Sequence, residues 1–179
     1  PEDITVPDGE WGFKGDCLVG VPLVNATAEA QTCTLTVSGE GVAEGTAPTV
    51  VHLPACSVQK VAVRFRAAFP ATGESVRPAL KVEAASGVST SAPATLVIRL
   101  TDRWSTRRVT FESGIDGSVQ YYSVVPHSDR GASEIQPGLV LSLHGASVEA
   151  TSQASSYKAK PSLVIACPTN RRPYGFDWE

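Results

Sequence analysis

Residues 139–143 are followed by a histidine and a glycine, and this part of the sequence has the clearest capacity for chemistry. The run, Leu-Val-Leu-Ser-Leu, is nearly continuously apolar, and His144, Gly145 and Ala146 follow it directly. Such a run is typical of a strand buried on both faces of a parallel sheet. Glycine lets the chain turn sharply at the end of the strand. Backbone N–H groups fixed at such a turn can stabilise the negative oxygen that forms during acyl transfer.

The segments around this run predict a mixed sheet. Residues 107–112 and 119–125 are predicted strands, and the Ser-Gly-Ile-Asp-Gly sequence between them is typical of a tight hairpin. Residues 147–157 are the expected helix, with Glu149 favourably placed near its start. Residues 162–167 are a second buried strand. A hairpin, a strand, a helix and a strand in this order begin an α/β fold.

Three short motifs give this segment a family resemblance. Residues 121–126 have the sequence Tyr-Tyr-Ser-Val-Val-Pro, the apolar run ends in His-Gly, and the later strand continues into Pro168, Thr169 and Asn170. These motifs resemble the second, third and fourth strands of α/β-hydrolases of the prolyl oligopeptidase type and of the feruloyl and acetyl esterase type. The resemblance extends over residues 107–179, and it covers the first half of a typical hydrolase domain.

The resemblance implies a serine hydrolase whose oxyanion hole includes the turn after the His-Gly strand. The backbone N–H of Ala146 would be one donor, Ser147 would offer a second, and His144 would brace the turn. A serine would attack the acyl carbon of a small-molecule ester, in preference to that of a peptide. Ligands of open α/β sheets bind at the carboxyl ends of the strands. The loop after the last predicted strand therefore contains the candidate substrate-binding residues, which are Arg171, Arg172, Tyr174, Asp177 and Trp178.

The nucleophile of such an enzyme is missing from the sequence. The family places it in a Gly-x-Ser-x-Gly elbow, and no such pentapeptide occurs here. His52 is expected on a strand and His127 in a loop, both in structural roles. The chain opens at Pro1 and contains no methionine. We therefore expect an amino-terminal fragment of a longer product, without a catalytic triad and inactive by itself.

Residues 1–102 have a different pattern, in which short apolar runs are broken by Gly, Pro, Ser and Thr. In the clearest run, Val61, Val63 and Phe65 share one face of a strand and the residues between them share the other. The predicted strands cover residues 17–24, 32–38, 50–53, 58–66, 79–84 and 94–100. Their number and spacing predict an antiparallel immunoglobulin-like β-sandwich. The predicted fold is therefore mainly β, with this sandwich domain at 1–102 and the incomplete start of an α/β-hydrolase domain at 103–179.

Composition argues against several other classes of protein. The net charge of −3 disfavours a general nucleic-acid binder, and no apolar run is long enough to span a membrane. No metal site or cofactor is expected, because the sequence has no Cys-x-x-Cys spacing and no glycine-rich phosphate loop. A disulfide among Cys17, Cys33 and Cys56 stays open, whereas Cys167 is expected in a core. Asn25 begins a glycosylation sequon, which we interpret as a chance match.

Two hypotheses about function follow. The first is the serine hydrolase, whose immunoglobulin-like module suggests export to the periplasm or the cell exterior. The second is a non-catalytic β-sandwich that binds carbohydrate or protein through its loops, with the α/β segment as an appendage. Because half an α/β domain leaves apolar strands uncovered, we also expect the segment 103–179 to dock on the sandwich or to self-associate.

Overall fold

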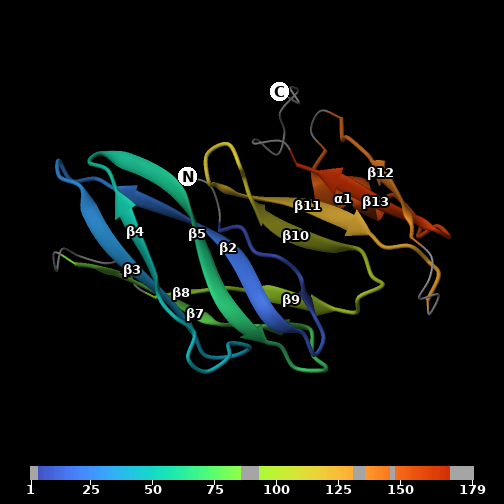
Figure 1. Ribbon diagram of the computed structural model, residues 1–179, viewed down its shortest axis with the longest axis horizontal. Coiled ribbons are helices and arrows are strands. Elements are labelled where there is room, and N and C mark those ends of the chain that lie inside the picture. The colour runs from blue at the N-terminus through green and yellow to red at the C-terminus, as the bar shows by residue number, and fades with distance from the viewer. Residues whose placement is uncertain (1–3, 86–92, 131–135, 146–147, 170–179) are drawn as a thin grey trace.

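The computed structural model describes residues 4–85, 93–130, 136–145 and 148–169 (Figure 1). Within these ranges 52% of the residues lie in strands and 4% in helix, so the prediction of a mainly β chain is confirmed. The described strands form four sheets, with two, three, four and four strands. Among the described residues, no helix has the length and the apolar sequence that crossing a membrane requires.

The longest strands, β2 (Lys14–Asn25) and β5 (Ser57–Ala68), pair with each other along their whole length in antiparallel register. In each strand, alternate residues point to the same side, and Cys17, Val19 and Val21 of β2 lie with Val61, Val63 and Phe65 of β5 in one cluster of buried residues. Val19 is fully buried and Val63 is 1% exposed, and these two residues pair directly. The apolar face of the pair therefore forms one wall of a hydrophobic core.

The opposite wall is a four-stranded antiparallel sheet in the order β4-β3-β7-β8. Its members are β4 (Thr49–Leu53), β3 (Gln31–Ser38), β7 (Ala79–Ala84) and β8 (Ala94–Thr95). Leu35 of β3 is fully buried and Leu80 of β7 is 2% exposed. Both belong to the same cluster of buried residues as Val19 and Val63, so one core lies between the two sheets.

A small third sheet closes one end of this core, in the order β1-β9-β6. It contains β1 (Gly9–Glu10), β9 (Ile98–Thr101) and β6 (Ser75–Val76). The single strand expected at residues 94–100 is therefore two strands in two different sheets. The chain changes sheet at Leu96 and Val97, where Leu96 is buried in the core and Val97 is 48% exposed. An alternating apolar pattern in the sequence does not reveal where the chain passes from one sheet to another.

The carboxyl-terminal segment forms a mixed sheet in the order β10-β11-β13-β12 (Figure 1). Its strands are β10 (Arg107–Glu112), β11 (Val119–Val125), β12 (Gly138–Leu141) and β13 (Leu163–Pro168). Strand β11 runs antiparallel to both of its neighbours, whereas β12 and β13 are parallel. The predicted hairpin is confirmed, and it turns at Gly117, which has a φ of 69°.

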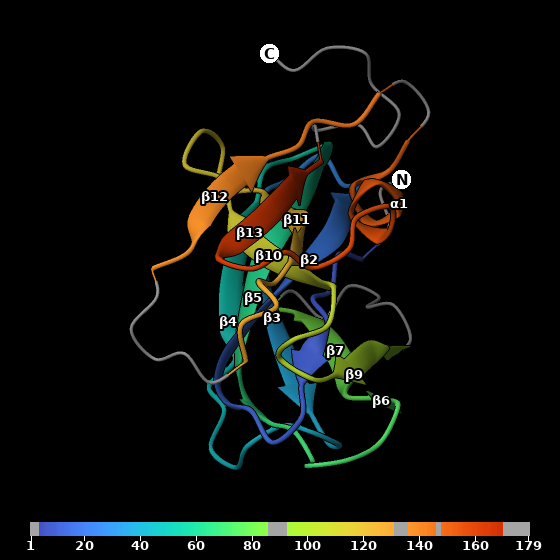
Figure 2. The ribbon, with the colours of Figure 1, turned by 90° about the vertical axis from the view of Figure 1, so that its right-hand side faces the viewer.

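Helix α1 (Ala150–Ser155) connects β12 to β13 and covers one face of the mixed sheet (Figure 2). It is shorter than the expected helix at residues 147–157. Ala150 and Ala154 are fully buried, and Ala154 packs with Val125, Ile165 and Cys167 in a second, smaller hydrophobic cluster. The small alanine side chains let the helix lie close to the sheet.

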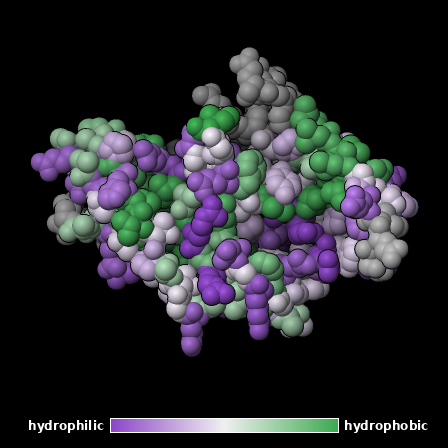
Figure 3. Space-filling view, viewed as in Figure 1, coloured by the Kyte–Doolittle hydropathy of each residue, from purple (hydrophilic) through white to green (hydrophobic). Residues whose placement is uncertain are grey.

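Strand β12 is an exposed edge strand, and the expectation that its apolar run is buried on both faces is wrong. Leu139 is 71% exposed and Leu141 is 63% exposed. Both lie on the face of the sheet that α1 does not cover, because Val140 is in register with Ile165, which packs under α1. Figure 3 shows apolar residues gathered on the surface at the end of the molecule where β12 lies.

The mixed sheet packs against the outward face of the β2–β5 pair. A Cβ atom at Gly20 would lie only 2.8 Å from Cβ of Val119, so the two backbones meet closely there. Next to this contact, the hydroxyl of Thr110 donates a hydrogen bond of 2.7 Å to the carbonyl oxygen of Leu18. The predicted segments 1–102 and 103–179 are thus in direct contact through backbone and side chains.

Candidate functional site

The turn that follows β12 lies at the carboxyl ends of the parallel strands β12 and β13, which is the edge where open α/β sheets bind ligands. His144 lies in this turn and is 4% exposed. Its Nδ1 atom is 3.0 Å from the carbonyl oxygen of Gly145. The same carbonyl accepts a hydrogen bond of 3.2 Å from the N–H of Val148. The ring of His144 and the N–H of Val148 therefore both contact the Gly145 carbonyl.

The upstream end of the turn is fixed to β13 and α1. The N–H of Ser142 donates a hydrogen bond of 2.9 Å to the carbonyl oxygen of Ala166. Its hydroxyl lies 2.8 Å from that of Tyr157, and the side-chain amide of Gln153 donates to both oxygens. Cys167 is buried beside this group, and burial raises the pKa of its thiol. A protonated, buried thiol is a poor nucleophile, so Cys167 has a packing role.

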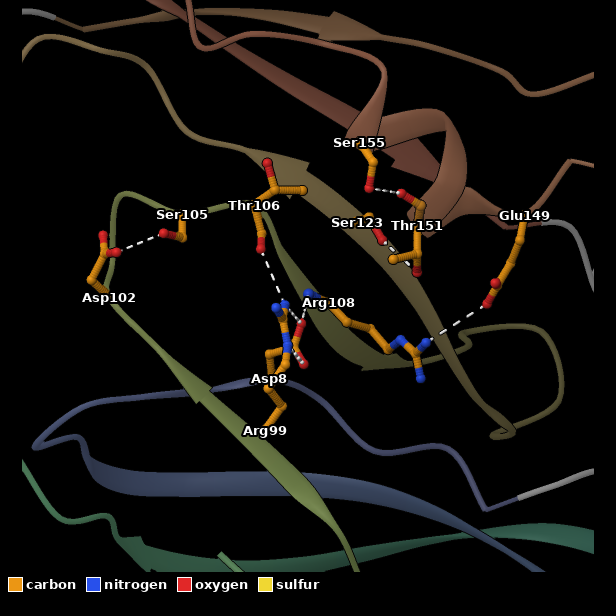
Figure 4. A network of polar contacts seen from close by, with 10 residues as sticks. All are labelled: Asp8, Arg99, Asp102, Ser105, Thr106, Arg108, Ser123, Glu149, Thr151 and Ser155. Atoms are coloured by element: carbon orange, nitrogen blue, oxygen red, sulfur yellow. Dashed lines mark hydrogen bonds and ion pairs between the residues drawn. The ribbon is translucent and has the colours of Figure 1, made fainter. Parts of the chain in front are cut away.

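The downstream end of the turn is fixed by the carboxylate of Glu149 (Figure 4). The phenol of Tyr121 donates a short hydrogen bond to this carboxylate. One nitrogen of the Arg108 guanidinium lies 3.7 Å from the same oxygen, and the guanidinium carbon lies 4.5 Å from the centre of the Tyr121 ring. Burial, together with the negative charge and hydrogen bond of Glu149, raises the pKa of Tyr121 to about 12. Tyr121 is therefore a neutral hydrogen-bond donor at ordinary pH.

Asp8 joins this group to the amino-terminal segment. Its carboxylate accepts two hydrogen bonds, of 3.0 and 2.7 Å, from the guanidinium of Arg99, and a third of 2.7 Å from the backbone N–H of Arg108. The hydrogen bond to Asp8 raises the pKa of Arg99 further, so the guanidinium remains charged. Bidentate pairs of this kind fix the orientation of both side chains. Asp8, Arg99 and Arg108 line a cleft of about 410 Å³ that also reaches Thr151 and Ser155 of α1.

A second cleft lies away from this turn, between β4, β5 and the β10–β11 hairpin. Its volume is about 870 Å³, and its polar lining includes His52, Lys60, Glu112, Asp116 and Gln120. The ring of His52 is held through a contact of 2.9 Å between its Nδ1 and the hydroxyl of Thr32.

Most of the predicted site residues fall outside the described ranges. These are Ala146, Ser147, Arg171, Arg172, Tyr174, Asp177 and Trp178. His144 is described and lies within the turn, and its bracing role stays a prediction. His127 follows β11 and packs edge-on against Trp104, with 5.3 Å between the ring centres, which is a structural role.

The role expected for Glu149 differs from the one it has in the structure. Glu149 precedes the first residue of α1, yet its side chain makes no capping hydrogen bond to the helix. Its carboxylate binds Tyr121 and Arg108 instead. Tyr121 and Arg108 are functional candidates that sequence reasoning missed. No local signal could have found them, because the contact between residues 121 and 149 exists only when α1 packs on β11.

The remaining polar candidates have structural roles. Asn25 is 4% exposed, and its amide donates to the carbonyl oxygens of Glu29 and Pro54 while its carbonyl accepts from Thr27. Its side chain is thus buried and fully bonded, which agrees with the interpretation of the sequon as a chance match. The four cysteines are all free, and burial raises the pKa of Cys17 to about 12. Within the described ranges, no three His, Cys, Asp or Glu side chains are grouped to hold a metal ion.

No family model matches the chain, and no curated protein sequence matches it.

Proposed function

We propose that this chain is the amino-terminal part of a serine hydrolase that cleaves esters in preference to peptides. In this proposal residues 1–102 are an immunoglobulin-like accessory domain, and residues 103–179 begin the catalytic α/β-hydrolase domain. The single observation that carries the proposal is the strand order β10-β11-β13-β12, with β11 alone running against the others.

This strand order supports the resemblance because it is not the simplest order that these elements could form. A hairpin followed by a strand, a helix and a strand could add its last strand at the outer edge of the sheet. Here β13 lies between β11 and β12 instead, with α1 packed on one face. An α/β-hydrolase sheet begins in the same way, with an antiparallel second strand and with the fourth strand placed between the second and the third. The His144–Gly145 turn then follows the strand that precedes the oxyanion loop in that family.

The accessory domain is supported by the arrangement of the first two sheets. The β2–β5 pair and the sheet β4-β3-β7-β8 enclose one core of alternating inward residues, as in a β-sandwich. The mixed sheet packs on the outside of this arrangement, at Gly20 and Leu18. This placement fits a sandwich that supports the catalytic domain from one side.

In the proposed reaction, the chain supplies electrostatic stabilisation and the longer product supplies the nucleophile. The serine oxygen forms a bond to the acyl carbon of the ester while a base of the longer product takes the serine proton, and the carbonyl oxygen of the substrate becomes negative. The N–H of Ala146 donates to that oxygen. Collapse of the intermediate breaks the bond to the alcohol oxygen, which takes the proton from the base, and water then hydrolyses the acyl-serine to the acid and free serine. The 179 residues alone have no elbow serine, so they do not turn over ester.

The proposal is tested with the coding sequence that follows Glu179 in the source. We expect a Gly-x-Ser-x-Gly elbow within several dozen further residues. A chain extended through the complete domain should react with a fluorophosphonate probe and hydrolyse p-nitrophenyl acetate. The 179-residue chain and an elbow Ser→Ala variant of the extended chain should do neither. A continuation that contains no such elbow would overturn the hydrolase and leave the binding module as the better hypothesis.

The oxyanion role is tested in the same extended chain. Ala146→Pro removes the backbone N–H that would donate to the substrate, and we expect kcat to fall by roughly 10²–10³-fold. Ala146→Gly keeps the N–H and is the matched control, which should retain most of the activity. An equal fall in kcat in both variants would show that the N–H of Ala146 does not stabilise the oxyanion.

A further inference from the structure

The carboxylate of Glu149 is held by groups that come from two other strands rather than from its own helix. Tyr121 of β11 donates to it, and Arg108 of β10 places a guanidinium 3.7 Å away. The side chains of Glu149 and Arg108 are 35% and 29% exposed, so water only partly screens the pair. A carboxylate with a hydrogen-bond donor and a cation on the same side is fixed in orientation.

The position of Arg108 is set by the amino-terminal segment of the chain. Asp8 accepts a hydrogen bond from the N–H of Arg108, and the N–H of Asp8 donates to the carbonyl of Arg108 at 3.0 Å. Asp8 is in turn clamped by the bidentate contact with Arg99 on β9. An unbroken series of hydrogen bonds and ion pairs therefore runs from β9, through Asp8 and Arg108, to Glu149 (Figure 4).

Glu149 directly follows Val148, which contacts the residues after β12. The N–H of Val148 donates a hydrogen bond to the carbonyl of Gly145. Val148 is the residue directly before Glu149, so a displacement of Glu149 moves the donor of that hydrogen bond. No side-chain cap ties Glu149 to the helix, and its contacts with Tyr121 and Arg108 are the restraints on its side chain that the structure shows.

We propose that Glu149 is a positioning residue for Val148 and its hydrogen bond to the carbonyl of Gly145, and that Asp8 of the amino-terminal segment acts on this contact through Arg108. The accessory domain would then hold Val148 in place through Asp8 and Arg108. The inference depends on the proposed function only for what the turn does in catalysis. The mechanical link itself is a property of the 179-residue chain and can be measured there.

The first test is amide hydrogen exchange of Val148 in the 179-residue chain. Glu149→Gln keeps the size of the side chain but removes its charge, and Tyr121→Phe removes only the donor. Both variants should raise the exchange rate of Val148 by about tenfold, because each loses a charge-assisted hydrogen bond. The amides of Val19 and Val63 in the β2–β5 pair report global unfolding, and their rates should stay the same.

Glu83→Gln is the matched control. It removes a carboxylate from an exposed ion pair with Lys81 on β7, away from the turn. It should leave the exchange of Val148 unchanged. If Val148 exchange does not rise in Glu149→Gln, or if it rises only in parallel with that of Val19 and Val63, the positioning role is wrong.

The link from Asp8 is tested with a double-mutant cycle. Asp8→Asn alone should raise Val148 exchange several-fold. Combined with Glu149→Gln it should add little, because the two residues act through the same arginine. Fully additive effects would overturn the part of the proposal that assigns the action of Asp8 to Arg108.

In the extended chain, Glu149→Gln should lower kcat and leave KM for the ester nearly unchanged, because the turn would act in the transition state. An extended chain with no esterase activity would refute the proposed function, while the exchange experiments would still decide the positioning role. A Val148 rate that does not respond in the short chain would refute the positioning role, whatever the activity of the extended chain.

Discussion

Two weakly acidic side chains, the buried Cys17 and the half-buried Tyr121, connect the stability of the fold to alkaline pH. Burial raises the pKa of Cys17 from 9.0 to about 12. Burial and the neighbouring Glu149 raise the pKa of Tyr121 from 10.0 to about 12. Each group binds its proton more tightly in the folded chain than in the unfolded chain. The stabilisation is therefore complete below about pH 9 and is lost as the pH rises toward 12.

We expect the urea midpoint of the wild-type chain to fall steeply above pH 9. Cys17→Ala should remove the part of this fall that starts near pH 9, and Tyr121→Phe the part that starts near pH 10. Each variant is compared with its own midpoint at pH 7, so that its constant cost in packing cancels. A variant that loses stability with the same pH dependence as the wild-type chain would contradict the assignment of that residue.

The residue scale also shows where prediction from sequence reaches its limit. His144 was identified from a local pattern, because an apolar strand that ends in His-Gly is recognisable within ten residues. Arg108, Tyr121 and Glu149 are spread over three elements, and their contact depends on how α1 packs on β11. Asp8 meets Arg108 across one hundred positions of the chain. Only the folded structure brings such residues together.

At the scale of elements, Gly20 controls how closely β2 approaches β11. A methyl group there would lie 2.8 Å from Cβ of Val119 and 3.2 Å from Cε of Lys60. Val119 is fully buried, so it has no room to move aside. We expect Gly20→Ala to destabilise the chain by about 1–3 kcal/mol, which is the usual cost of overpacking.

Gly114→Ala is the control for this variant, because a Cβ atom at Gly114 meets nothing within 4 Å. Urea unfolding should show little change in Gly114→Ala. If Gly20→Ala were equally harmless, the close contact between β2 and β11 would not be a determinant of how the two sheets pack.

The exposed edge formed by β12 predicts association between copies of the chain. An edge strand has N–H and C=O groups without a neighbouring strand along one side, and apolar residues on its open face make it a template for pairing with another strand. We expect light scattering to show an apparent mass that rises with concentration. Leu139→Lys and Leu141→Lys should each reduce this rise without loss of fold, since both side chains are already exposed.

Ile115→Lys is the matched control, because Ile115 is 86% exposed in the β10–β11 hairpin and lies outside β12. It should leave the association unchanged. A wild-type chain that remains monomeric at every concentration would contradict a role of the β12 edge in association.

The elements also differ in how well the sequence predicts them. The hairpin β10–β11 followed directly from two alternating runs and a glycine-rich turn. The exposure of β12 does not follow from its sequence. A continuous apolar run indicates that both faces of a strand are suited to burial, but it does not show whether another element covers them. The break between β8 and β9 was missed for a similar reason. Leu96 and Ile98 are both buried, so the apolar pattern continues while the backbone leaves one sheet and enters another.

At the scale of the whole molecule, stability is distributed unevenly. The first core contains seventeen buried hydrophobic residues among those described, and the cluster under α1 contains four. The mixed sheet depends in part on contacts with the β2–β5 pair, such as that between Thr110 and Leu18. We therefore expect the two parts to open at different free energies.

Native-state hydrogen exchange at low urea concentrations measures this difference. Amides of β11 and β13 should exchange through a smaller opening than those of β2 and β5. Asp8→Asn should widen the gap, because it weakens the hydrogen bond from the N–H of Arg108 that joins the two parts. A single common free energy of opening for all four strands would show that the molecule unfolds as one unit.

The position of β13 inside the mixed sheet has a consequence for biosynthesis. A ribosome releases β12 before β13, yet β12 pairs only with β13 in the finished sheet. At roughly 5–20 residues per second, the chain from Leu141 to Pro168 takes about 1–5 s to emerge. Throughout that interval Leu139 and Leu141 belong to a nascent strand that has no partner. The newly made chain therefore passes through an obligatory period in which chaperone binding and aggregation compete for the same leucines.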